Sequence, residues 1–243
     1  MRPAIVLLHG FAGTGAAWAP VVDRLGERYR ALTPDIRGHG AAAAERPTDF
    51  AACVSDVAAL AERFALAGYS LGGRLALHVA LEHPERVTRL VVIGAHPGIA
   101  DPLEREARRR DDEDLAARLE TETIEEFADR WERRPLFRGQ PPEVAAAARE
   151  DRLRNRPRDL AAALRGLGTG TMTPLWARLP ELALPVTAIV GERDAKFRKL
   201  AERMVAALPD AELVVVPDVG HAVHLEAPAL VAATIAERVP ASI

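Results

Sequence analysis

The sequence predicts an α/β fold, in which a mostly parallel β-sheet is covered by helices on both faces. Six apolar runs of strand length alternate with stretches of helical periodicity, which is the pattern of repeated strand–helix–strand units. One long segment interrupts this alternation without any strand-like run. The predicted strands lie near residues 4–8, 29–33, 64–68, 89–94, 186–190 and 212–216.

Four stretches between these runs place apolar residues three or four positions apart, as amphipathic helices do. A helix that covers a sheet needs such a stripe, so each stretch predicts a helix packed on the core. The four stripes are Trp18, Val21, Val22 and Leu25; Phe50, Val54, Val57 and Leu60; Phe197, Leu200, Met204 and Leu208; and Leu230, Val231 and Ile235.

Residues 97–175 predict a set of short charged helices inserted into the core. The segment follows a predicted strand, carries prolines at the expected bends, and has no strand-like run of its own. We therefore expect a core of residues 1–96 and 176–243 and a helical cap of residues 97–175 over the active site. The apolar side of these helices consists of Leu115, Leu119, Ile124, Phe127 and Trp131.

Composition narrows the classes of function. The chain has 243 residues, 49% of them apolar, and a net charge of −3, which gives no reason to expect nucleic-acid binding. No run approaches the roughly 20 apolar residues of a membrane span, and the apolar stretch after Arg2 is too short for a signal peptide. The single cysteine, Cys53, excludes an internal disulfide and suits a reducing compartment. We expect a cytoplasmic protein without membrane partners, as a monomer or a small homo-oligomer.

The segment Gly68–Gly73 reads Gly-Tyr-Ser-Leu-Gly-Gly and contains a Gly-x-Ser-x-Gly motif. An apolar run precedes it and a helical pattern follows it, which is the strand–turn–helix context of a nucleophile elbow. Such a turn is tight, so its flanking residues must be small, and it raises the hydroxyl of Ser70 above the sheet. The backbone N–H of Leu71 then faces the same space and is the first expected donor of an oxyanion hole.

A serine hydroxyl needs a histidine to take its proton and a carboxylate to orient that histidine. Asp194 and His221 each follow a predicted strand, in the order serine, acid, histidine that accompanies this elbow. Asp218 is the rival acid, but it precedes His221 by only three residues and would have to fold back. The junction after the first strand holds His9-Gly10-Phe11, and Phe11 is the expected second N–H donor.

Other histidines have simpler interpretations. His78 and His83 lie on or at the end of the helix after Ser70 and are expected to pack or face solvent. His39 lies in a turn-like Arg-Gly-His-Gly segment. His224, three residues after His221, is expected to support the site or to contact the substrate.

Arg74 is the most informative charged residue. It follows Ser70 by four positions on the predicted helix, so the two project on the same side. A permanently charged guanidinium beside a nucleophile suits a carboxylate substrate, whereas a neutral ester would give no reason for a charge at this position. Most arginines of residues 97–175 are interleaved with acidic residues and are expected to form a solvated surface.

With these motifs in place, the chain resembles the α/β-hydrolase superfamily over nearly its whole length. Within it, the chain resembles the 2-succinyl-6-hydroxy-2,4-cyclohexadiene-1-carboxylate synthases of menaquinone biosynthesis. The resemblance rests on His9–Phe11, Gly68–Arg74, Gly94–Gly98, Phe127–Trp131, Leu153-Arg154, Gly191–Arg198 and Gly220-His221 with His224 and Glu226. Ala95 stands where we expect a glycine, and the usual first strand or two of the superfamily sheet are expected to be absent.

The resemblance implies a lyase that eliminates pyruvate from a succinyl-enolpyruvyl-hydroxycyclohexene carboxylate, with no metal or organic cofactor. In that reaction His221, held by Asp194, takes the proton of Ser70, and Ser70 acts as the base toward the substrate carbon. The implied substrate-binding residues are Arg74, Arg108, Arg154, Tyr69 and Trp131.

Two other functions stay open from sequence. The nearer one is a serine carboxylesterase or a carbon–carbon bond hydrolase acting on a carboxylate-bearing substrate. The other is a non-catalytic ligand receptor on the same fold, against which the complete set of triad residues argues.

Overall fold

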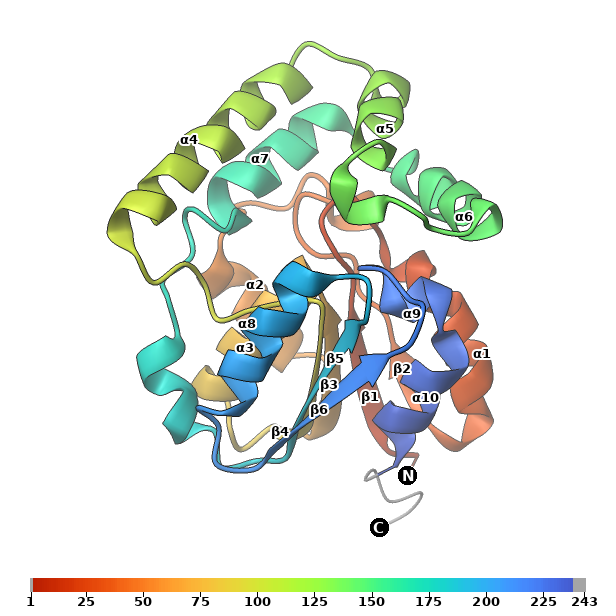
Figure 1. Ribbon diagram of the computed structural model, residues 1–243, viewed down its shortest axis with the longest axis vertical. Coiled ribbons are helices and arrows are strands. Elements are labelled where there is room, and N and C mark those ends of the chain that lie inside the picture. The colour runs from red at the N-terminus through yellow and green to blue at the C-terminus, as the bar shows by residue number, and fades with distance from the viewer. Residues whose placement is uncertain (1, 238–243) are drawn as a thin grey trace.

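The core is a six-stranded sheet in which all neighbouring strands run parallel, in the order β2-β1-β3-β4-β5-β6 (Figure 1). The computed structural model describes residues 2–237. All six predicted strands are confirmed, and their bounds differ from the predicted ones by a few residues at most. They are β1 (Ala4–Leu8), β2 (Arg30–Leu32), β3 (Phe64–Tyr69), β4 (Val87–Ile93), β5 (Val186–Gly191) and β6 (Ala211–Val216).

Helices cover both faces of the sheet, because alternate residues of each strand point to opposite sides. Val6 and Leu8 of β1 point to the face that is covered by α2 (Phe50–Ala58), α3 (Leu71–Glu82) and α8 (Ala195–Val205). Ile5 and Leu7 face α1, α9 and α10 on the other side. These last three helices span Ala19–Leu25, Val223–Glu226 and Pro228–Ala236. The predicted architecture, a parallel sheet with helices on both faces, is confirmed.

Three of the predicted helical stripes extend beyond the α-helices that carry them. Trp18 lies in a short 3₁₀ turn (Gly15–Trp18) before α1, and the other two stripes run past the end of their helices. Helix α2 ends at Ala58 and α8 ends at Val205, so Leu60 and Leu208 lie in the turns that follow. In both turns a backbone N–H bonds a carbonyl three residues earlier, Leu60 to Val57 and Leu208 to Val205. This tighter turn keeps the two leucines against the core although the α-helix has ended.

Between β4 and β5 the described residues form helices and turns without any strand. The four α-helices there are α4 (Pro102–Leu119), α5 (Ile124–Glu132), α6 (Pro142–Arg152) and α7 (Pro157–Leu167). Three of them begin with a proline, which suits the first turn because its backbone nitrogen needs no partner there. Helix α5 begins with a capping box between Thr123 and Glu126.

These helices lie over the edge of the sheet at which the strands end (Figure 1). Leu119, Phe127, Trp131 and Leu164 form a separate apolar cluster, which also contains Ala12 from the loop after β1. The division into a core (residues 1–96 and 176–243) and a cap (residues 97–175) remains our proposal for the domain boundaries. Residues 1 and 238–243 of the proposed core lie outside the described residues.

None of the helices within residues 2–237 is both long enough and apolar enough to cross a membrane.

Candidate active site

The turn after β3 holds Ser70 in a backbone conformation that few residues other than glycine adopt, with φ 52° and ψ −109°. The surrounding backbone is so close that side chains are excluded on both sides. A Cβ atom on Gly68 would lie 2.2 Å from the carbonyl oxygen of Gly72, and a Cβ on Gly72 would lie 2.2 Å from the carbonyl oxygen of Leu8. Such strain is kept where surrounding structure fixes it, and it occurs mainly at functional sites.

His221 and Asp194 meet beside this turn. The Nδ1 atom of His221 lies 2.5 Å from Oδ2 of Asp194, and both side chains are buried. Asp194 follows β5 directly and caps α8 by accepting a hydrogen bond from the N–H of Phe197. Asp218, the rival acid, is exposed and lies in a turn after β6.

The other ring nitrogen of His221 is not engaged by any residue that the structure describes. Nε2 is buried and has no hydrogen-bond partner among the described residues. His221 and Ser70 line the same cavity, and Nε2 of His221 forms no hydrogen bond with the hydroxyl of Ser70 in this arrangement. A hydrogen bond from His221 to Asp194 through Nδ1 leaves Nε2 as an acceptor, which is the arrangement that a serine base requires.

Both expected oxyanion donors border this cavity. Leu71 is the first residue of α3, where backbone N–H groups have no partner within the helix. Phe11 lies in the loop after β1 and contacts the ring of Trp131 at a centroid distance of 5.2 Å. The nearby helix N-terminus also favours negative charge at this position.

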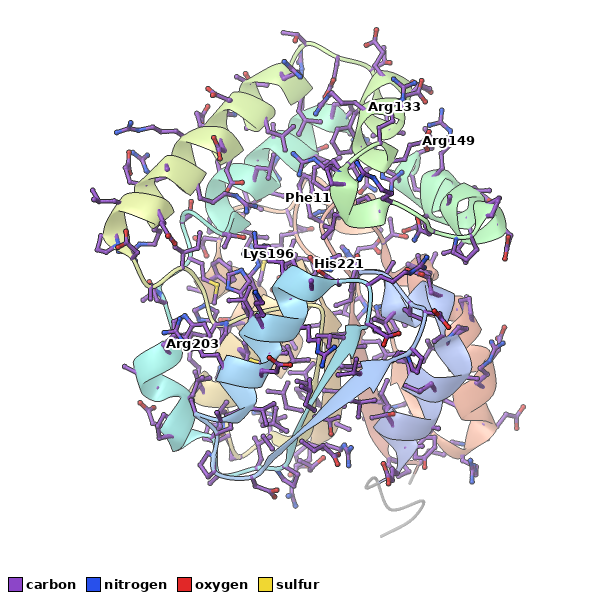
Figure 2. The ribbon with its side chains drawn as sticks, in the orientation of Figure 1. Phe11, Arg133, Arg149, Lys196, Arg203 and His221 are labelled. Atoms are coloured by element: carbon purple, nitrogen blue, oxygen red, sulfur yellow. The ribbon has the colours of Figure 1, made fainter. Side chains whose placement is uncertain are left out.

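The cavity has a volume of about 510 Å³ and lies between the elbow and helices α4, α5 and α7. Four cationic side chains line it, against two carboxylates, those of Asp111 and Asp112. Figure 2 shows Lys196 and His221 at the end of the core that faces these helices. The four cations are Arg74, Arg108, Arg134 and Lys196.

Arg74 is buried at the base of the cavity. One of its nitrogens, Nη1, donates a hydrogen bond of 2.9 Å to the carbonyl oxygen of Leu167. Burial, together with the charge of Arg108, lowers the pKa of Arg74 to about 9, while the charge of Asp112 opposes the shift. The guanidinium is therefore charged at pH 7, and an anion in the cavity would restore the interactions lost on burial.

The two cap arginines implied by the resemblance occupy different places. Arg108 lines the cavity, and its Nε donates to Oδ1 of the buried Asp112 at 2.7 Å. Arg154 lines a second cavity that adjoins this one, together with Tyr69, and not the cavity that holds Ser70. It lies past the end of α6, is half-exposed, and pairs with Glu150 at 3.2 Å.

A second, smaller cavity of about 270 Å³ adjoins the first, and the two share Phe11 and Trp131 as walls. Tyr69 lines the smaller one, where its ring packs on that of His224 at a centroid distance of 4.2 Å. Burial, reinforced by the charge of Asp194, raises the pKa of the Tyr69 hydroxyl, which stays protonated at neutral pH.

Sequence reasoning assigned no site role to Arg152, Arg134 or Lys196. Arg152 is buried, lines the smaller cavity and has an Nη1 atom without a hydrogen-bond partner among the described residues. The sequence carries a signal for the inward direction of Arg152, because this residue continues the helical spacing of Val144, Ala145 and Ala148, whereas Arg154 does not. The Ser70 cavity includes Arg134 and Lys196 through their long side chains, although both residues are largely exposed.

Two histidines near the site are buried as neutral imidazoles. Burial lowers the pKa of His224 to about 3, with a further contribution from the charge of His221. Burial also lowers the pKa of His39 to about 3, and Nδ1 of His39 faces the carbonyl oxygens of Ile36 and Arg37. His39 is therefore part of a turn, as expected, and His224 supports Tyr69 from below.

Lowering the pH from 7 to 5 is expected to reduce the free energy of unfolding by about 2 kcal/mol for each of these histidines. In the unfolded chain each histidine is protonated below about pH 6.5, whereas in the folded protein it stays neutral until about pH 3. The contribution to the free energy of unfolding is therefore fully present above pH 6.5 and is lost progressively as the pH falls toward 3. Urea unfolding at the two pH values measures the effect. A His224→Gln variant should show about 2 kcal/mol less pH dependence, and an unchanged pH dependence would contradict the assignment.

No three His, Cys, Asp or Glu side chains within residues 2–237 lie together in an arrangement that could hold a metal ion.

Comparison with known proteins agrees with this geometry. The profile of the α/β hydrolase family matches residues 5–234. The chain belongs to that family. A Bacillus subtilis (strain 168) protein assigned as 2-succinyl-6-hydroxy-2,4-cyclohexadiene-1-carboxylate synthase is 36% identical over 96% of this chain and 89% of its own length. The synthase of that name from Klebsiella pneumoniae is 35% identical, over 97% of this chain and 93% of its own.

A solved structure of MenH from S. aureus superimposes with a TM-score of 0.93 at 30% identity, covering 98% of this chain and 93% of that one. Within the α/β hydrolases, the chain therefore belongs to the family of these synthases, and it is an enzyme of the lyase class.

Proposed function

We propose that this protein is a 2-succinyl-6-hydroxy-2,4-cyclohexadiene-1-carboxylate synthase that eliminates pyruvate from a succinyl-enolpyruvyl-hydroxycyclohexene carboxylate. The observation that carries the proposal is the joining of a serine–histidine–aspartate set and four cationic side chains in one cavity. The substrate has three carboxylates, and a cavity that gathers cations beside a base suits it better than a neutral ester. The sequence relatives named for this reaction support the same assignment.

The reaction begins with removal of the proton next to the succinyl ketone. Nε2 of His221 takes the proton of Ser70, and the oxygen of Ser70 takes the proton from the substrate carbon. The imidazolium that results is stabilised by the carboxylate of Asp194 through the contact at Nδ1. The N–H groups of Phe11 and Leu71 donate to the ketone oxygen, where negative charge collects in the enolate.

Collapse of the enolate completes the elimination. Its electron pair forms the new ring double bond and breaks the carbon–oxygen bond to the enolpyruvyl group, which leaves as the enolate of pyruvate. The pyruvate enolate takes up one proton at its methylene carbon to become the ketone, and the imidazolium of His221 gives up one proton, so the count balances. Arg74 and Arg108 hold carboxylates in the Ser70 cavity, while Arg152 is placed to hold one in the smaller cavity. Tyr69 and Trp131 form walls of the pocket, and water has no chemical role in these steps.

Incubation with the succinyl-enolpyruvyl-hydroxycyclohexene carboxylate tests the proposal. We expect pyruvate to be released at a rate far above the uncatalysed one, measured by coupling to lactate dehydrogenase and the loss of NADH absorbance. Hydrolysis of p-nitrophenyl acetate, measured in parallel, is expected to be slow. Rapid ester hydrolysis without pyruvate release would favour the carboxylesterase or carbon–carbon bond hydrolase instead.

A further inference from the structure

Two cap side chains, one at the end of α6 and one in the turn before α7, hold the loop after β1 that carries Phe11. Oδ2 of Asp151 accepts a hydrogen bond of 2.8 Å from the N–H of Thr14, and Oδ1 accepts one from the hydroxyl of Thr14. Nδ2 of Asn155 donates to the carbonyl oxygen of Ala12 at 3.1 Å. Its Oδ1 accepts a bond of 3.0 Å from the N–H of Gly40.

These bonds hold a conformation that the loop is poorly suited to adopt alone. Ala12 has a φ of 61°, in the left-handed region that residues with a Cβ rarely occupy. Such a residue persists only where its surroundings fix it, and the bond from Asn155 acts on its carbonyl group directly. The peptide that carries the N–H of Phe11 lies one residue before Ala12, so a change in this conformation moves that N–H.

The same segment also presents a cation to the substrate side. Asp151 and Asn155 are both buried, at 8% and 5% exposure, and Arg152 lies between them in sequence and lines the smaller cavity. Burial raises the pKa of the Asp151 carboxyl, while its bonds to Thr14 oppose the shift. Burying a carboxylate costs desolvation free energy even when two neighbouring groups donate to it, so the burial of Asp151 suggests that the position of its bonds is important for the site.

We infer that Asp151 and Asn155 are positioning residues, which hold the oxyanion loop at residues 11–14 from the cap and fix the direction of the Phe11 N–H. We call this set of bonds the cap–loop contact. The inference rests on the proposed function for the role of the Phe11 N–H, although the contact itself can be tested without it. Because Arg152 belongs to the same turn, a carboxylate bound there stabilises the cap–loop contact, and binding is linked to the geometry of the oxyanion hole.

Asp151→Ala and Asn155→Ala are expected to lower kcat for pyruvate release by roughly 10- to 100-fold, since a donor displaced by about 1 Å loses much of its effect. KM should change by less than kcat does. Asp151→Asn should recover most of kcat, because its amide can still pair with the N–H and the hydroxyl of Thr14. Glu143→Gln, which removes an exposed carboxylate from the other end of α6, is the matched control and should behave as wild type.

Hydrogen–deuterium exchange of the intact protein, followed on a peptide spanning residues 9–17, reports the contact without any substrate. The two alanine variants should exchange faster in this peptide, while the peptide of β4 stays protected. If Asp151→Ala does not fold, Thr14→Val removes only the hydroxyl contact and should give a smaller change in the same direction. Unchanged exchange in the alanine variants would overturn the inference, and so would faster exchange with an unchanged kcat. A wild-type enzyme that releases no pyruvate would overturn the proposed function alone.

Discussion

Replacing Ser70 by alanine is expected to lower kcat/KM for pyruvate release by roughly four orders of magnitude or more, with the fold intact. Ser70 is the group proposed to touch the substrate proton, and no other hydroxyl occupies its place in the elbow. His221→Ala should cause a loss of similar size, because both residues act in one proton transfer and their effects do not add. Steady-state kinetics together with the thermal unfolding midpoint measure the two quantities separately.

The carboxylate of the triad offers a matched pair of variants. Asp194→Asn should lower kcat about 10³- to 10⁴-fold, since an amide facing Nδ1 of His221 favours the wrong tautomer of the ring. Asp218→Asn removes an exposed carboxylate that follows the neighbouring strand, and it should leave kcat nearly unchanged. Ser55→Ala on the exposed side of α2 is the control for the serine variant. Near-normal turnover of Ser70→Ala, or an equal loss in the two aspartate variants, would refute the triad.

Arg74→Ala is expected to lower kcat/KM for pyruvate release by roughly 30-fold or more, which corresponds to a loss of about 2–5 kcal/mol for one buried carboxylate contact. The guanidinium is buried, charged at pH 7 and placed in the Ser70 cavity, so its removal leaves a substrate carboxylate without its partner. Arg74→Lys should recover only part of the loss, because an ammonium cannot bind a carboxylate through two parallel hydrogen bonds.

Hydrolysis of a small neutral ester separates carboxylate binding by Arg74 from the catalytic role of Ser70, His221 and Asp194. The rate of p-nitrophenyl acetate hydrolysis, where measurable, should be almost the same in Arg74→Ala as in wild type. Arg110→Ala serves as the control, since Arg110 lies on the exposed side of α4 and pairs with Glu106. The bond from Arg74 to Leu167 is lost as well, so the unfolding midpoint is measured for each variant. A parallel loss of both activities would mean that Arg74 supports structure rather than substrate binding.

The sequence by itself determined the fold and the positions in it of the residues proposed to carry the chemistry. Each strand is short, apolar and bounded by polar or turn residues, and this local pattern is sufficient to place all six. The elbow is equally local, because Gly68 and Gly72 are required by contacts within a few residues or with the adjacent β1. Asp194 and His221 follow strands of a parallel sheet, whose carboxyl ends must meet at one edge, so their proximity follows from strand order.

Only the tertiary structure decided which charged side chains of the cap face the site. Arg152 and Arg154 are two residues apart and both line the second cavity, yet Arg152 is buried there while Arg154 is half-exposed and pairs with Glu150. Asp151 and Asn155 bond to a loop about 140 residues earlier, and nothing in the local sequence specifies that partner. The sequence pattern of a helix shows which of its faces is apolar. The orientation of that helix over the sheet depends on how four helices pack together and on the core, and segments from the whole chain contribute to that packing.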